Sequence, residues 1–254
     1  MPGCDRPFVH VDKVSMRFGQ TEAVRQVSFA VERGTIFGLV GSDGAGKSTL
    51  LRMIATMIRP ASGTILIDGL NTVSEKRQVK NRIGYMPQRF GLYQDLTVDE
   101  NIDFFMDIYG IRGAERKKRK ERYLGFSNLL PFADRQAGNL SGGMKQKLGL
   151  ACVLVHEPQM LILDEPTNGV DPVSRMEFWE ILGQMRQNGM TLLVSTAYLD
   201  EGEKCDSIGL MHRSQLLEKA SPAEIRSNFA NLEEAIIIRI QESDKELADD
   251  TFKR

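Results

Sequence analysis

The sequence lacks any long apolar run. None of its stretches approaches the roughly 18 consecutive apolar residues that a membrane-spanning helix needs, although the chain has 254 residues and is 41% hydrophobic. The N-terminal residues MPGCDRPF also lack the apolar core of a signal peptide. We therefore expect a globular protein that is soluble by itself, with one large core or a core plus a small subdomain.

Cysteine is scarce and neither sign of charge is in excess. Cys4, Cys152 and Cys205 are far apart and form neither a metal-ligand spacing nor an obvious disulfide framework. We expect free thiols in a reducing cytosol. Lys and Arg number 33 against 34 Asp and Glu, for a formal net charge of -1. Such a chain has no overall field that attracts nucleic acid or anionic lipid, so any such partner must bind locally.

A glycine-rich loop is the strongest motif. Residues 41–49 read GSDGAGKST, and glycines let consecutive backbone N–H groups turn toward a phosphate at the positive end of the next helix. Lys47 is expected to reach the β- and γ-phosphates, and the Ser48 hydroxyl to bind Mg²⁺. The predicted contacts of a nucleoside triphosphate are Gly41, Ser42, Asp43, Gly44, Ala45, Gly46, Lys47, Ser48 and Thr49.

The flanking segments support this interpretation. Residues 35–40 (TIFGLV) are typical of a buried strand, and residues 47–58 have helical apolar spacing that stops before Pro60. A glycine-rich turn without a ligand is the alternative, and this strand–loop–helix order disfavours it.

The rest of the chain predicts an α/β fold. Residues 8–34 alternate polar and apolar positions, which indicates antiparallel strands, and 62–69 and 82–88 are further strand candidates. A helical pattern over 92–139 indicates an inserted subdomain. The later strands and helices then alternate, which favours a parallel sheet.

Two acids follow the predicted strand MLIL at residues 160–163. Asp164 and Glu165 are therefore expected at the carboxyl end of that strand, where open α/β sheets bind ligands. Asp164 suits Mg²⁺, and Glu165 suits polarisation of an attacking water. A pair of acids at a helix start is the alternative, which the phosphate loop makes less attractive.

The motif LSGGMKQ at residues 140–146 narrows the class. Here the sequence resembles the ATP-binding cassette (ABC) family, over about residues 8–217, and most closely the ATP-binding subunits of multidrug and other exporters. LSGGMKQKLGLA resembles the family signature, DEPTNGVDP its Walker B motif and D-loop, YMPQRFGLYQDLTVDEN its Q-loop, and RFG at 17–19 its adenine-stacking loop.

The resemblance implies a P-loop NTPase core with a mostly parallel sheet, an N-terminal antiparallel β subdomain and an inserted helical subdomain. We place the cassette at residues 5–230, its helical subdomain at about 92–155, and a short C-terminal helix with a polar, frayed tail at 231–254.

The resemblance also assigns roles to further residues. Phe18 would stack on adenine, with a place in the core as the alternative. Gln88 would bind Mg²⁺ and sense a partner, and Asp171 would lie at a dimer seam, although it is equally a helix cap before Pro172. The signature residues Ser141, Gly142 and Gly143 would contact ATP held by a second cassette, and an ordinary cap explains only Ser141.

Cofactors and partners follow from the same resemblance. They are ATP, Mg²⁺, a separate membrane-spanning permease and a second cassette, either another copy or a different chain. The chain would lie at the cytoplasmic face of the inner or plasma membrane, peripheral through the permease. Phe90, Leu92 and Tyr93 are candidates for permease contact or, equally, for core packing.

Four departures from the family pattern stand out. Ala197 lies where the family has the switch histidine that bonds the γ-phosphate, and loss of one such donor costs on the order of 10²–10³ in rate. Tyr198 is adjacent, but its side chain is expected to point elsewhere. The milder departures are Asp43 beside the phosphates, Met144 in the signature, and Asn168 with Val170 in the D-loop.

Two alternative functions stay open. A catalytically impaired, regulatory cassette is favoured by Ala197 and opposed by Glu165, and a cassette protein acting on ribosomes or DNA would carry the same motifs. The basic run 117–122 invites a nucleic-acid or lipid partner, but interleaved Glu115 and Glu121 favour a solvated helix face. We expect no nucleic-acid partner.

Overall fold

The fold consists of two sheets and their surrounding helices. The computed structural model describes residues 6–227 and 229–252. The strands are β1 (Val9–Phe18), β2 (Thr21–Val31), β3 (Ile36–Val40), β4 (Ser62–Ile67), β5 (Leu70–Asn71), β6 (Ile83–Met86), β7 (Met160–Asp164), β8 (Thr191–Thr196), β9 (Ser207–His212) and β10 (Gln215–Ala220). The α-helices are α1 (Lys47–Ile54), α2 (Lys76–Lys80), α3 (Val98–Ile108), α4 (Gly113–Phe126), α5 (Gly142–Leu154), α6 (Pro172–Gln187), α7 (Pro222–Arg226) and α8 (Leu232–Phe252), with 3-10 helices at Leu130–Phe132, Ala137–Asn139 and Leu199–Lys204.

The N-terminal sheet is antiparallel, as predicted. Its strand order is β2-β1-β4-β5, and β1 pairs with β2 from Val9 opposite Val31 to Phe18 opposite Thr21. Val9 and Val11 are buried while the residue between them is exposed. The alternation in sequence therefore reflects a sheet with one buried face.

The second sheet is mostly parallel, with strand order β10-β9-β3-β8-β7-β6. Its central strands are apolar throughout because both faces are covered. In β3, Ile36 and Val40 face one core cluster, whereas Phe37 and Leu39 face the other. The exception is β10, which pairs antiparallel with β9 and which the sequence did not reveal.

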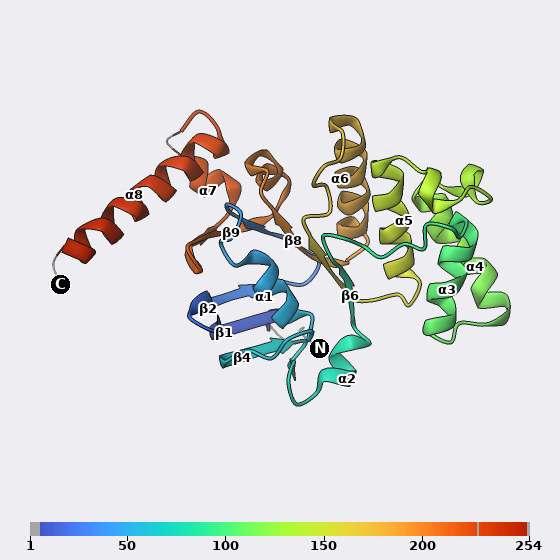
Figure 1. The fold of residues 1–254 in the computed structure, drawn as a ribbon, viewed down its shortest axis with the longest axis horizontal. Coiled ribbons are helices and arrows are strands. Elements are labelled where there is room, and N and C mark those ends of the chain that lie inside the picture. The colour runs from blue at the N-terminus through green and yellow to red at the C-terminus, as the bar shows by residue number, and fades with distance from the viewer. Residues whose placement is uncertain (1–5, 228, 253–254) are drawn as a thin grey trace.

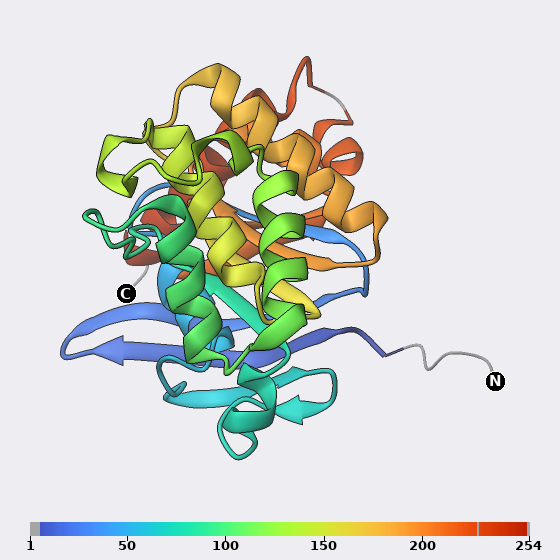
Figure 2. The same ribbon diagram turned by 90° about the vertical axis from the view of Figure 1, so that its right-hand side faces the viewer.

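Helices separate and cover the sheets. Helix α1 lies between the antiparallel sheet and the parallel sheet (Figure 1), and α5 and α6 lie on the opposite face of the parallel sheet. Helices α3 and α4 pack outside α5, so that a layer of helices faces the viewer in Figure 2. The α/β fold class predicted from the sequence is confirmed by this arrangement.

Helix α3 shows why the inserted segment is helical. Thr97 caps it by accepting from the backbone N–H of Glu100 at 3.1 Å, and the Glu100 carboxylate accepts from the Thr97 N–H at 2.8 Å. In α4, the basic run is paired within the chain: Arg119 contacts Glu157 at 3.0 Å and Lys120 contacts Asp99 at 2.8 Å. These ion pairs favour the solvated-face interpretation of residues 117–122.

Two predicted boundaries were wrong. Helix α1 ends at Ile54 and not at residue 58, because Thr56 adopts a left-handed conformation with φ 60° that no α-helix continues. Helix α8 runs over 21 residues to Phe252, so most of the expected polar tail is helical.

Cys152 and Cys205 are free, as expected, and burial raises the pKa of the Cys205 thiol to about 12. Cys4 lies outside the described residues.

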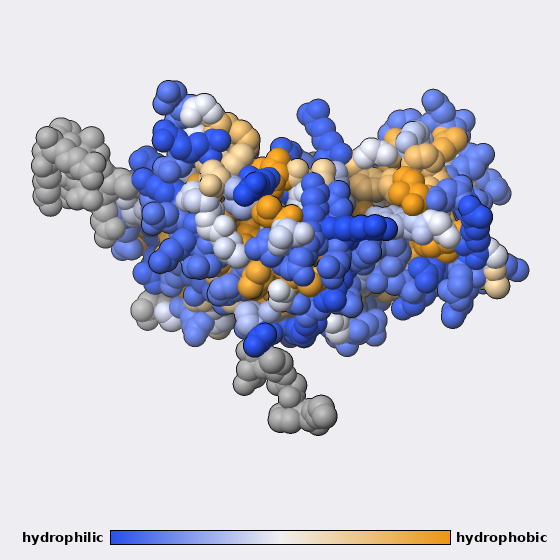
Figure 3. Space-filling view, turned by 90° about the horizontal axis from the view of Figure 1, so that it is seen from below, coloured by the Kyte–Doolittle hydropathy of each residue, from blue (hydrophilic) through white to orange (hydrophobic). Residues whose placement is uncertain are grey.

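The described helices include none with the length and apolar character of a membrane span. The face seen from below in Figure 3 is mainly hydrophilic, with apolar residues in scattered patches.

Candidate active site

The predicted motifs meet at one edge of the parallel sheet. Strand β3 is in register with β8 up to Val40 opposite Thr196, and β7 with β8 up to Asp164 opposite Ser195. The carboxyl ends of these strands therefore lie together. The phosphate loop follows β3, Asp164 ends β7 with Glu165 directly after it, and Ala197 follows β8. Parallel α/β sheets bind ligands at this edge.

Two glycines of the loop are required by close backbone approach. Gly41 has φ 155° and Gly46 has φ 99°. A Cβ on Gly41 would lie 2.1 Å from the Met211 carbonyl oxygen, and one on Gly46 would lie 2.2 Å from that of Ala23. A larger residue at either position would push the loop away from β9 or β2, which carry these carbonyl groups.

Lys47 is folded back into the loop. Its side chain is only 3% exposed, and its Nζ donates to the carbonyl oxygens of Gly41 at 2.7 Å and Ser42 at 3.0 Å. The same ammonium lies 3.3 Å from Oε1 of Glu165. Lys47 and Glu165 thus form a buried ion pair between the two predicted motifs.

Asp164 organises a hydroxyl cluster. Its Oδ1 accepts from the hydroxyls of Ser48 and Ser195, both at 2.8 Å, and it is fully buried. The Tyr85 hydroxyl lies 3.4 Å from Oδ2, and burial, followed by the Asp164 charge, raises the pKa of Tyr85. The side chains of Ser48 and Asp164, which the sequence analysis expected to share a Mg²⁺ ion, therefore lie in direct contact.

Glu165 is held in an unusual backbone conformation. Its φ is 49°, in the left-handed region, and its N–H lies 3.0 Å from Oγ of Ser195. Its Oε2 accepts from the side-chain amides of Gln88 at 2.8 Å and Asn168 at 3.1 Å. Asn168 was not among the predicted site residues, although the sequence marks it as a departure in the D-loop three residues after Glu165.

A cavity of about 260 Å³ opens over the loop. Its lining combines loop and neighbouring residues: Gly44, Ala45, Gly46, Lys47, Ser48, Thr49, Glu165, Thr21, Glu22, Ala23 and Ser214. The last four were missed by the sequence analysis. Phe18 lies opposite Thr21 in the β1–β2 hairpin and is 51% exposed, so the alternative that Phe18 belongs to the core is wrong.

The signature residues lie elsewhere in the chain. Ser141 caps α5 by accepting from the Met144 N–H at 3.3 Å. A Cβ on Gly143 would lie 2.4 Å from Cβ of Ser174 in α6, whereas Gly142 has open space around it. None of the three signature residues lines the cavity over the phosphate loop. The close packing of α5 against α6 explains on structural grounds why position 143 is glycine.

Asp171 caps α6 by accepting from the Ser174 N–H at 3.0 Å. That hydrogen bond holds the pKa of Asp171 below its ordinary value. In the single chain, Asp171 thus acts as the N-cap of α6, which is one of its two predicted roles.

A second carboxylate network follows β8. Glu201 is 1% exposed and accepts from the hydroxyls of Thr196 at 2.6 Å and Thr167 at 2.8 Å. Arg175 donates to it at 3.2 Å and stacks on the ring of Tyr198, with its Cζ 3.9 Å from the centroid. Tyr198 therefore points toward α6, as expected, and not toward the site.

The segment after Gln88 divides between core and surface. Phe90 stacks on Phe105 at a centroid distance of 5.4 Å, and Leu92 is buried. Tyr93 is 47% exposed and rests edge-on against Phe104. Only Tyr93 of the three predicted contact residues keeps an exposed side chain.

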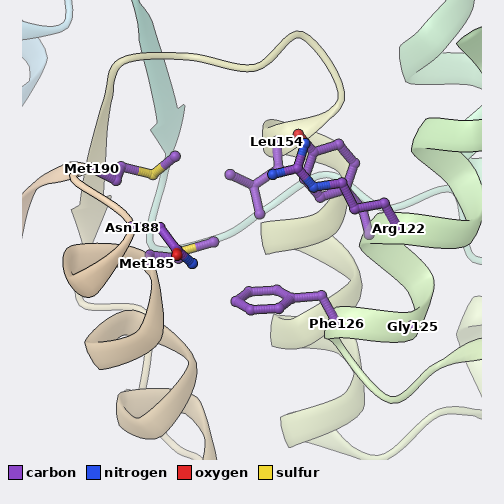
Figure 4. Close-up of a pocket in the computed structure, with 8 residues that line it drawn as sticks. Arg122, Gly125, Phe126, Leu154, Met185, Asn188 and Met190 are labelled. Carbon is purple, nitrogen blue, oxygen red and sulfur yellow. The ribbon is translucent and has the colours of Figure 1, made fainter.

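A larger cavity of about 470 Å³ lies between the ends of α4, α5 and α6. Figure 4 shows Phe126, Leu154 and Met185 meeting around it from these helices. It shares no lining residue with the cavity over the phosphate loop, and its lining combines apolar side chains with Arg122, Tyr123 and Asn188.

Comparison with known proteins identifies the family of the chain. The family model described as "ABC transporter" matches residues 24–168. The chain is 44% identical over 228 residues to the probable multidrug ABC transporter ATP-binding protein YbhF of Escherichia coli, covering 90% of this chain but only 38% of that protein. It is 34% identical to the linearmycin resistance ATP-binding protein LnrL of Bacillus subtilis, covering 87% of this chain and 72% of LnrL.

Solved structures of ATP-binding cassettes have the same fold as this chain. An ATP-binding subunit of an ABC transporter superposes with a TM-score of 0.80 at 29% identity, covering 91% of this chain and 99% of that one. The cassette MJ0796, solved as a dimer in a post-hydrolysis state with ADP and Pi, gives 0.74 at 26% identity, covering 84% and 98%. The phosphate loop, the acids at the sheet edge and these relationships show that the chain belongs to the ABC transporter family of ATP-binding cassettes.

Proposed function

We propose that the chain binds and hydrolyses ATP as the cassette subunit of an exporter and thereby powers a separate permease. The observation that carries this proposal is the convergence of Lys47, Ser48, Asp164 and Glu165 at one edge of the sheet. The names of YbhF and LnrL support export. Residues 5–230 would form the cassette, with its helical subdomain at about 92–155, and 231–254 a C-terminal segment.

Phosphate binding would use the loop from Gly41 to Thr49. Backbone N–H groups at the start of α1 favour an anion there. Lys47 would exchange its present partners, two carbonyl oxygens and the Glu165 carboxylate, for phosphate oxygens. Phe18 would offer its exposed ring to adenine, which gains dispersion contacts.

The residues present fit Mg²⁺. A hydroxyl and a carboxylate already converge in Ser48 and Asp164, 2.8 Å apart, and the amide oxygen of Gln88 would complete a set of hard oxygen donors. When bound, Mg²⁺ would neutralise charge on the phosphates. Ser195 and Tyr85 hold the Asp164 carboxylate in position for that role.

Glu165 would orient the attacking water once Lys47 has moved to the phosphates. Its carboxylate is free of the ion pair in that state, while its left-handed backbone and the Ser195 bonds fix its direction. Hydrolysis needs such a positioned base beside the transferred phosphoryl group.

A second cassette would complete the site. Ser141 caps α5, and the exposed Gly142 and the buried Gly143 form its first turn, where the backbone N–H groups of a helix start suit a phosphate presented from outside. Asp171 would lie at the seam of that dimer. The permease would contact the surface around Tyr93, which holds the chain at the cytoplasmic side of the membrane.

Ala197 favours a second candidate function, in which the chain hydrolyses ATP slowly. Its methyl group cannot donate a hydrogen bond to a phosphate, and the Tyr198 ring is held under Arg175. A regulatory cassette that binds ATP and hydrolyses it slowly is therefore the alternative function.

ATP hydrolysis by the purified chain tests both the proposed exporter ATPase and the alternative of an impaired, regulatory cassette. We expect measurable Mg-ATP hydrolysis that Glu165→Gln abolishes without loss of ATP binding, and a rise on the order of 10²-fold in Ala197→His. Hydrolysis that is unchanged by Glu165→Gln would contradict the proposed site. A wild-type rate equal to that of Ala197→His would contradict the impaired-site alternative.

A further inference from the structure

The carboxylate of Glu165 is held by three side chains, and they divide between its two oxygens. Lys47 pairs with Oε1 at 3.3 Å, whereas Gln88 and Asn168 both donate to Oε2, at 2.8 and 3.1 Å. Under the proposed function, on which this inference rests, Lys47 leaves for the phosphates. The two amides then decide where the carboxylate points.

The two amides are not equivalent. Gln88 carries the proposed Mg²⁺ and partner contacts, and its loop reaches the surface at Tyr93. Asn168 lies in the same loop as Glu165, and its N–H donates to the Glu165 carbonyl oxygen at 3.2 Å. Asn168 is therefore tied to Glu165 by both backbone and side chain.

The fold fixes the loop that carries Asn168. Thr167 donates to the buried Glu201 at 2.8 Å, and the N–H of Val170 donates to the Thr167 carbonyl oxygen at 3.2 Å. Glu201 is held in turn by Thr196 and Arg175. A fixed backbone on either side of Asn168 reduces the entropy lost when its amide orients a carboxylate.

Positions 197 and 198 supply no comparable donor to the site. Residue 197, directly after β8, is alanine, and the Tyr198 ring stacks with Arg175 at 3.9 Å. Among the described residues, the side-chain donors to Oε2 of Glu165 are the two amides alone.

We infer that Asn168 is a positioning residue that holds Glu165 for water activation, in place of a donor at position 197. Asn168 is solvent-exposed while Glu165 is buried, so its substitution removes one hydrogen bond without opening the core. Because Asn168 acts through Glu165 and does not contact the phosphate loop, its loss should lower kcat and leave KM for ATP unchanged.

A double-mutant cycle tests this inference. Steady-state Mg-ATP hydrolysis is measured for the wild type, Asn168→Ala, Ala197→His and the double variant. In the wild-type background we expect Asn168→Ala to lower kcat about tenfold with KM within about twofold. In the Ala197→His background, where imidazole holds the site, we expect less than about a threefold loss.

Two variants sharpen the comparison. Asn168→Asp keeps the shape of the side chain but replaces the donor with an acceptor, so we expect a loss at least as large as that of Asn168→Ala. Asn81 is exposed and caps the C-terminal end of α2, outside the motifs, so Asn81→Ala should leave kcat unchanged.

The failures are distinguishable. A wild-type chain without ATP hydrolysis overturns the proposed function together with this inference. A hydrolysing wild type in which Asn168→Ala has no effect, or the same effect in both backgrounds, overturns the inference alone. Asn168→Asp with full activity also overturns it.

Discussion

Single side chains in this cassette take partners that lie far away in sequence. Ser48 and Asp164 share a hydrogen bond across 116 positions, and Lys47 pairs with Glu165. His156 provides a case outside the site: its Nε2 lies 3.0 Å from the Ile83 carbonyl oxygen, and its ring stacks on Tyr109 at a centroid distance of 4.1 Å. Burial lowers the pKa of His156 below 6.5, and the Ile83 contact only partly opposes it.

The pKa of His156 predicts a loss of stability in mild acid. Below the ordinary pKa of 6.5, His156 is protonated in the unfolded chain but still neutral in the folded chain. The free energy of unfolding therefore falls as the pH falls toward the lowered pKa of the folded state. At pH 5.5 this contribution is at most about 1.4 kcal/mol. Urea unfolding at pH 7.5 and 5.5 should show a smaller pH dependence for His156→Gln than for the wild type. The exposed His10 is the control, and an equal change in His10→Gln would contradict the assignment.

Helix junctions hold the signature in place. The start of α5 packs directly on the start of α6, where Gly143 meets Ser174, and both helices begin with capping side chains, Ser141 and Asp171. Backbones can approach this closely only where one of the two residues has no side chain. The signature glycines therefore have different local surroundings although they are neighbours.

This difference predicts opposite effects of two alanine substitutions. Gly143→Ala should lower the free energy of unfolding by about 2 kcal/mol, because its Cβ would overlap Ser174. Gly142→Ala meets open space and should be neutral or stabilising by up to about 1 kcal/mol. Adding Ser174→Gly should recover part of the Gly143→Ala loss. Urea unfolding measures the wild type and the three variants, and equal stability of the two alanine variants would contradict this packing argument.

Under the proposed function, the chain as a whole carries two halves of an ATP site that do not meet within one molecule. The phosphate loop opens at the edge of the parallel sheet, whereas Ser141 and its glycines lie at the start of α5, outside that cavity. Two copies arranged head to tail would bring each half to the complementary half of the other.

An ATP-dependent dimer is the expected result. The Glu165→Gln variant should retain Mg-ATP and shift from monomer to dimer in size-exclusion chromatography with light scattering. Ser141→Glu in that background should prevent the shift, since a carboxylate would face the phosphates of the other copy. Ser74→Glu, at an exposed serine outside the motifs, should not. A monomer at saturating ATP would mean that the second cassette is a different chain.

The sequence by itself determined the phosphate loop, the acid pair, the family and the α/β class. These depend on local spacing: glycines, a lysine and a hydroxyl within nine residues, or an apolar run ending in two acids. The sequence placed the end of α1 and the tail less well, because a left-handed residue at Thr56 and the continuation of α8 to Phe252 are not visible in periodicity.

Only the tertiary structure decided how the motifs are connected. Gln88 on Glu165, Thr167 on Glu201, Gly143 against Ser174 and Ser214 beside the loop are contacts set by strand register and helix packing. Local spacing cannot reveal them, because each joins backbone directions that are fixed only once the parallel sheet has formed and both of its faces are covered.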